Sequence, residues 1–169
     1  MAIALLLCPA GCSRKPQTPQ AEATIEEPNT MMSTVRMADP KAASQLVKGF
    51  YPPEGNAWRW TSKAFTVTLR APADAATRGA KLVLRFAVPE PVIQRVKTVT
   101  LTAKVEGVAL PAVKYEKSGD YVYTQDVPAS VFKEDTVVAD FALDNYLHSG
   151  DVEKRELGVI VTTAGLEAK

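Results

Sequence analysis

Apolar and polar residues alternate with period two along most of the chain beyond residue 64, the pattern of β-strands that bury one face. In the first such run Phe65, Val67 and Leu69 alternate with two threonines and an arginine. Turn sequences around Gly107 and Gly119 separate later runs of the same kind. The predicted strands cover residues 65–70, 82–88, 99–105, 109–115, 120–126, 136–143 and 157–164.

Seven or eight such strands with no long helix between them predict an all-β protein, built as an antiparallel β-sandwich of two packed sheets. One short N-terminal helix is expected before the strands. Asp39 can cap it, Pro40 suits its first turn, residues 41–48 can wind, and Gly49 fits the position after its end. Residues 127–132 are predicted to form a turn, or a single helical turn, whose apolar side chains close one end of the sandwich.

The beginning of the chain has the pattern of a bacterial lipoprotein signal. An apolar run at residues 2–7 is followed by Ala10 and Gly11 directly before Cys12, which is the predicted site of lipidation. This divides the chain into a signal remnant at 1–11, a flexible tether at 12–33 and a β-sandwich domain at 34–169. The composition of the tether supports the division, because it is rich in Pro, Gln, Thr and Glu. The alternatives are an ordinary tail with two incidental thiols, or a disulfide between Cys8 and Cys12.

Charge and motifs exclude several classes of function. Lys and Arg total 20 against 19 Asp and Glu, so the sequence lacks the basic excess typical of proteins that bind nucleic acid. The sequence has no nucleophile elbow, no phosphate-binding glycine loop and no zinc motif. The adjacent acids Glu134 and Asp135 precede a predicted strand and are expected to be solvated. We therefore predict a protein that is not an enzyme and uses neither a cofactor nor a metal ion.

Four segments carry a resemblance to a known family: residues 105–110, 121–132, 136–143 and 155–161. In this order they resemble galactose-binding-like jelly-roll modules, over roughly residues 48–167. Two further segments, 49–55 and 58–61, together with the late Arg-Glu-Leu-Gly sequence, are similar to β-sandwich segments that accompany bacterial envelope glycosyltransferases. The resemblance implies a jelly-roll arrangement, a polysaccharide context and an ion pair between Glu54 and either Arg59 or Arg155.

The candidate binding residues gather between residues 49 and 61. Aromatic rings offer flat apolar faces and the polar side chains between them offer hydrogen bonds, which are the components of a sugar-binding platform. The alternative is that the two tryptophans, which lie two residues apart on one strand face, build the core, with Arg59 outside and paired with Glu54. The predicted ligand-binding residues are Tyr51, Glu54, Trp58, Arg59 and Trp60.

A second candidate is the loop at residues 144–151, which holds the single histidine, His148, beside two aspartates and a tyrosine. One histidine with scattered acids has no metal-ligand spacing, so a solvated loop is the preferred interpretation. Tyr121 and Tyr123 are expected on one face of a strand, either at the edge of the core or as a binding strip.

These observations predict a noncatalytic lipoprotein of the bacterial cell envelope whose β-sandwich binds carbohydrate. Its partner would be a glycan or an envelope protein, and it would contact the membrane through the lipid on Cys12 alone. The alternative is a structural or assembly lipoprotein whose sheet edges pair with other subunits.

Overall fold

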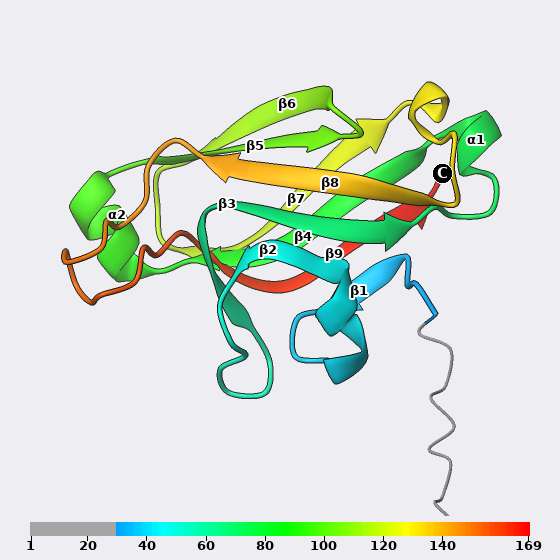
Figure 1. The fold of residues 1–169 in the computed structure, drawn as a ribbon. Helices are drawn as coiled ribbons and strands as arrows, with labels where there is room; N and C mark the ends of the chain where they lie inside the picture. Colours follow the sequence, from blue (N-terminus) through cyan, green and yellow to red (C-terminus); the bar gives the residue numbers. More distant parts are fainter. Residues whose placement is uncertain (1–29) are drawn as a thin grey trace, which may run out of the picture.

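The computed structural model describes residues 30–169, so the predicted lipidation site and nearly all of the predicted tether lie outside the described residues. Strands dominate the described part, and the helical segments are short (Figure 1). No helix within residues 30–169 has the length and apolarity needed to cross a membrane. In chain order the elements are β1 (Thr34–Arg36), η1 (Pro40–Gln45), β2 (Leu46–Phe50), β3 (Arg59–Arg70), α1 (Ala75–Arg78), β4 (Ala80–Val88), α2 (Glu90–Val96), β5 (Val99–Val105), β6 (Val108–Tyr115), β7 (Gly119–Val127), η2 (Ala129–Val131), β8 (Thr136–Leu143) and β9 (Ile160–Ala168).

The strands pair in antiparallel fashion into two sheets. In one sheet β4 lies between β7 and β9, and β9 also pairs with β1 and with the start of β3. In the other the order is β2, β3, β8, β5, β6. The 12-residue strand β3 belongs to both, because Arg59 and Trp60 pair with β9 whereas residues 64–70 pair with β8. This is the strand order of a jelly roll, so the predicted all-β sandwich is confirmed.

The core lies between the two sheets and follows the period-two pattern of the sequence. Leu82 and Leu84 are fully buried on the inner face of β4, and Phe86 and Val88 continue that face. Contacts across the core join the sheets: the Phe86 ring meets Tyr115 of β6 edge-on at 5.2 Å. The predicted strands are recovered: those at 99–105 and 136–143 have the predicted ends, and the ends of the others shift by up to four residues except the start of β3, which lies six residues earlier than predicted.

Two short helical segments close one end of the sandwich. Residues 129–131 form η2, and the neighbouring Phe132 is only 5% exposed, which confirms the predicted apolar turn at 127–132. η2 packs against α1, as Figure 1 shows near the C-terminus. The helix α2 at the other end was not predicted. It buries Val92 and ends at Lys97, whose φ of 67° stops the helix.

The N-terminal helix is shorter than predicted and is a 3-10 helix. Asp39 does cap it, since its side chain accepts a hydrogen bond from the backbone N–H of Lys41 at 2.9 Å. The helix ends at Gln45 instead of residue 48, because the residues that follow pair with β3 as β2. Gly49 therefore lies in a strand and not at a helix end. It has a φ of 76°, and a Cβ there would lie 2.1 Å from the carbonyl oxygen of Ala64.

Candidate functional site

The candidate residues lie on a hairpin that joins β2 to β3 and projects from the sandwich (Figure 1). The N–H of Tyr51 bonds to the carbonyl of Trp60 at 3.0 Å, and Glu54 faces Trp58 in a β-bridge nearer the tip. Gly55 and Asn56 both have positive φ, 58° and 51°, as the tight turn of a hairpin requires. The turn sequence Glu-Gly-Asn thus fixes which side chains face each other across the hairpin.

Trp58 and Trp60 form an edge-to-face pair, with ring centroids 6.5 Å apart and planes at 80°. Both side chains are half-buried. Trp60 packs against the core cluster, whereas Trp58 is outside that cluster and lies next to the turn, with its Nε1 3.5 Å from where a Cβ on Gly55 would be. Each of the two interpretations of the tryptophans, core packing and a surface platform, therefore fits one of them: Trp60 lies at the edge of the core and Trp58 on the surface.

Arg59 points to the opposite side of the strand from the tryptophans and binds backbone. Its guanidinium donates from Nε to the carbonyl of Met37 at 2.6 Å and from Nη1 to the carbonyl of Tyr51 at 2.9 Å. Desolvation by burial lowers the pKa of Arg59. The structure does not pair Arg59 with Glu54, because these carbonyls hold its guanidinium. Arg59 fastens the hairpin to the chain after β1.

Glu54 forms its ion pair with Arg155. Of the two partners expected for Glu54, the structure therefore has the one that is more distant in sequence. Arg155 Nη1 lies 3.1 Å from Glu54 Oε1, and its other nitrogens bond Glu153. The guanidinium also lies over the ring of Tyr51, 5.1 Å from the centroid. The hydrogen bond to Glu153 raises the pKa of Arg155 and lowers that of Glu153.

The loop between β8 and β9 thus forms one wall of the candidate site. The hydroxyl of Tyr51 donates to the carbonyl of Glu156 at 2.7 Å, and Glu156 Oε1 accepts from the backbone N–H of Lys63 at 2.8 Å. Sequence reasoning missed Glu153 and Glu156 as members of the site. The only indication was the Arg-Glu-Leu-Gly sequence, because contacts over about a hundred residues leave no periodic pattern.

The second candidate, the loop at 144–151, is held together by its own acids. Asp144 accepts from the N–H of Thr100 at 2.6 Å, and Asp151 accepts from the N–H of His148 at 2.8 Å. Asp151 also pairs with Arg95 at 3.0 Å. His148 is exposed. In the part of the chain that the structure describes, no group of three or more His, Cys, Asp or Glu is placed to hold a metal ion.

Asp144 is expected to make this loop sensitive to acid. Desolvation raises its pKa, but the hydrogen bonds from Thr100 and Asn145 outweigh it and leave the pKa below the ordinary value. The ionised form therefore stabilises the fold above the unfolded-state pKa of about 3.9, and this is lost as the pH falls through the lower folded-state pKa. Asp144→Asn should cost about 0.5–1 kcal/mol at neutral pH and less near pH 2. Urea titrations of both proteins at the two pH values test this, and a constant difference would contradict it.

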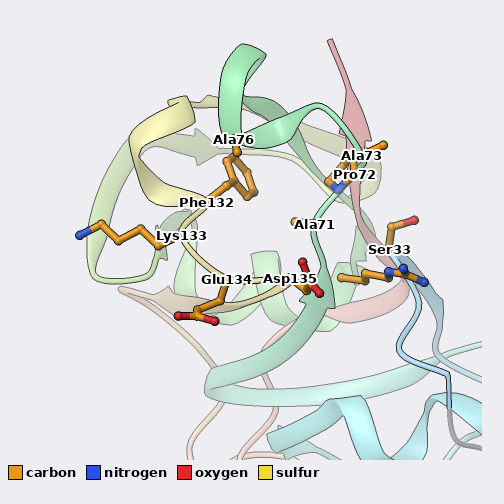
Figure 2. Close-up of a pocket in the computed structure, with 10 residues that line it drawn as sticks. Ser33, Ala71, Pro72, Ala73, Ala76, Phe132, Lys133, Glu134 and Asp135 are labelled. Atoms are coloured by element: carbon orange, nitrogen blue, oxygen red, sulfur yellow. The ribbon is translucent and has the colours of Figure 1, made fainter.

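A cavity of about 480 Å³ opens at the α1 and η2 end of the sandwich (Figure 2). Its walls come from the loop after β3 and the segment before β8, which a hydrogen bond from the N–H of Ala71 to the carbonyl of Asp135 joins at 2.8 Å. The Phe132 ring lies beside Ala76 and is nearly buried. Glu134 and Asp135 are exposed, as predicted. Because Phe132 has no free face, the cavity offers no stacking surface, and the hairpin is the better candidate for a sugar.

Comparison with known proteins gives a fold and no family. No protein-family model and no curated protein matches the chain. Among solved structures, a family GH115 4-O-methyl-alpha-glucuronidase with specificity for decorated arabinogalactans matches 93% of the chain, with a TM-score of 0.56 and 15% identity. The chain spans 20% of the length of that enzyme. At this identity the likeness shows that the chain and the matched segment of that enzyme share a fold.

Proposed function

We propose that this protein is a noncatalytic carbohydrate-binding domain, and that the β2–β3 hairpin binds the sugar. The observation that carries the proposal is the half-exposed edge-to-face pair of Trp58 and Trp60, with the carboxylate of Glu54 directly across the hairpin from Trp58. A pyranose ring can stack on an indole face while its hydroxyl groups bond to a carboxylate beside it.

The contacts of the five predicted binding residues favour three of them as ligand contacts. Arg59 donates to two backbone carbonyls, and the Tyr51 hydroxyl donates to the carbonyl of Glu156. These two residues therefore support the hairpin. Trp58, Trp60 and Glu54 remain for the ligand, and Arg155 holds the Glu54 carboxylate in place. A positioned carboxylate loses little side-chain freedom on binding, which favours affinity.

The fold comparison is compatible with this proposal. The GH115 enzyme acts on decorated arabinogalactans, and the chain matches a segment of that enzyme about one fifth of its length. A β-sandwich segment inside a carbohydrate-active enzyme is a reasonable setting for a sugar-binding role. The proposal nevertheless depends on the hairpin, because fold alone does not imply function.

We further propose that the domain is held at the bacterial cell envelope by a lipid on Cys12, as a lipoprotein whose only membrane contact is that anchor. The support is the small-residue pair before Cys12 and the polar composition of the segment after it. Mass spectrometry of the mature N-terminus tests this. A diacylglyceryl adduct on Cys12 supports the anchor, and an unmodified Cys12 in protein purified from its native membrane contradicts it.

Substitution of the tryptophans tests the binding site. Trp58→Ala should weaken binding to a soluble polysaccharide about 30-fold, the equivalent of about 2 kcal/mol for a buried aromatic contact, and leave the melting temperature nearly unchanged. Trp60→Ala should lower both the affinity for polysaccharide and the melting temperature, because Trp60 also packs against the core. Affinity electrophoresis on neutral polysaccharides and differential scanning calorimetry give the two readouts.

Val122→Ala is the matched control, because Val122 is an apolar side chain 52% exposed on β7, in a strand that does not pair with β2 or β3. It should change neither readout. Full binding by Trp58→Ala would contradict the proposed site. Concentration-dependent association of the wild-type protein, without affinity for any polysaccharide, would favour the alternative of a structural or assembly protein.

A further inference from the structure

The two arginines that hydrogen-bond to the hairpin are already occupied, and this bears on which sugars can bind at its tryptophans. Among the described residues these are Arg59 and Arg155. A third arginine, the exposed Arg36, borders the turn of the hairpin beside Asn56 and Ala57. A carboxylate or sulfate on a sugar is usually bound by an arginine whose guanidinium has two free donors for a bidentate pair. The contacts of each guanidinium therefore show whether such donors are present.

Arg155 is enclosed by protein partners. Nε and Nη2 bond Glu153, Nη1 bonds Glu54, and the guanidinium plane lies over the Tyr51 ring. Two carboxylates thus compensate one positive charge. A ligand carboxylate would have to displace one of them and lose an existing charge-assisted pair.

Arg59 is also unavailable. Its bonds to the carbonyls of Met37 and Tyr51, at 2.6 and 2.9 Å, use Nε and Nη1, and its side chain is on the opposite strand face from Trp58. Releasing it would leave two carbonyls without their donor. A sugar stacked on Trp58 would therefore find neither Arg155 nor Arg59 with its guanidinium free.

The side chain directly across the hairpin from Trp58 is an acceptor, the carboxylate of Glu54. The next carboxylates, Glu153 and Glu156, belong to the adjoining loop, and Glu156 accepts only from a neutral backbone N–H. In the described part of the chain, Lys63 and Lys154 form no ion pair with any of these three glutamates; Lys63 instead lies over Tyr146, 5.5 Å from its centroid. Carboxylates accept from hydroxyl groups and repel other carboxylates.

We infer that the hairpin selects uncharged glycans and rejects those that carry uronic acids, because the two guanidiniums bonded to it, Arg59 and Arg155, are committed to protein partners and the Glu54 carboxylate lies opposite Trp58. This inference rests on the proposed function. Glu54 and Glu153 are the residues that set the discrimination: Glu54 lies beside the ligand, and both hold Arg155.

The test uses matched polysaccharides that differ only in charge. Soluble glucan, galactan and mannan are compared with the same polymers after oxidation of their C6 hydroxyls to carboxylates. Wild-type protein in low salt should bind the neutral polymer at least tenfold more tightly than its oxidised form. The ratio should shrink toward 1 M salt, where the Debye length falls to about 3 Å.

The variant Glu54→Gln/Glu153→Gln should reduce this ratio to less than threefold, because it frees the Arg155 guanidinium and removes the facing charge. Glu153→Gln alone should lower the ratio part of the way. Glu116→Gln is the matched control, since Glu116 is an exposed carboxylate paired with Lys114 at 3.0 Å, next to β6 at the far edge of the sheet from β2. It should leave the ratio unchanged.

The outcomes separate the two claims. Equal or tighter binding of the oxidised polymer, lost in Trp58→Ala, overturns the inferred selectivity and leaves the hairpin as a sugar site. Discrimination that persists in the double variant also overturns the inference. Binding of neither polymer by the wild-type protein overturns the proposed function and the selectivity with it.

Discussion

Gly49→Ala is expected to cost about 4 kcal/mol or more of folding free energy, a large part of the stability of an ordinary domain. Two effects add at this position. A φ of 76° strains any residue with a Cβ by about 1–3 kcal/mol. The added Cβ would also lie 2.1 Å from the Ala64 carbonyl oxygen and 2.7 Å from the Cα of Phe65, so β2 and β3 would have to separate. Chemical denaturation followed by tryptophan fluorescence measures the loss.

Gly107→Ala supplies the control for backbone strain. Gly107 has a φ of 79°, almost the same as Gly49, but a Cβ there meets nothing within 4 Å. It should cost only about 1 kcal/mol. The difference between the two losses of folding free energy measures the cost of the steric overlap between β2 and β3. Equal losses would show that glycine is required at position 49 only for its positive φ.

Gln45→Leu is the second substitution with a large expected effect, about 3 kcal/mol. Gln45 is fully buried, and both ends of its amide are hydrogen-bonded: Oε1 accepts from the N–H of Met32 at 2.9 Å, and Nε2 donates to the carbonyls of Met32 and Thr68 at 2.9 and 2.8 Å. Leucine fills similar space but leaves these backbone groups short of a partner, at about 1–3 kcal/mol for each group left unsatisfied. Denaturant unfolding gives the loss of stability.

Hydrogen exchange locates the effect of Gln45→Leu, because the amide of Met32 should exchange much faster than in the wild-type protein. Gln94→Leu is the control, since the exposed Gln94 amide bonds only the Glu90 side chain, at 2.9 Å. Its cost should stay within about 0.5 kcal/mol. A loss in Gln45→Leu as small as that of the control would contradict a structural role for the buried amide.

The strands could be predicted from the sequence because each one buries a face of apolar side chains. In β3 this face holds Phe65, Val67 and Leu69, which are fully buried. On the polar face Arg70 is exposed, whereas Thr66 is also buried and donates to Asp140 at 2.6 Å. The length of the first helix could not be predicted in this way. Asp39 and Pro40 start it correctly, but pairing with β3 overrides the local preference of residues 46–48 for helix.

The members of the candidate site could be predicted only in part. The clustering of Trp58 and Trp60 with Glu54 is local, because a hairpin brings together residues close in sequence. From the sequence, the ion-pair partner of Glu54 could be Arg59, 5 residues away, or Arg155, 101 residues away. Only the three-dimensional fold shows that the partner is Arg155. Tertiary contacts between loops depend on the arrangement of both sheets, which a one-dimensional pattern does not contain.

The hydrogen bonds of Met32 have a mechanical consequence when the domain is pulled from its N-terminal side. The Met32 carbonyl accepts from both the Gln45 amide and the backbone N–H of Arg70, so this residue is joined to η1 and to β3 before β1 begins. A pulling force from the preceding chain would be transmitted through these bonds to β3, the strand that both sheets share. Several hydrogen bonds would then bear the force together, so β1 would not be separated from β9 one hydrogen bond at a time. Force applied from the N-terminal side would thus be resisted by the body of the sandwich, and the β2–β3 hairpin at the other end of β3 would keep its shape.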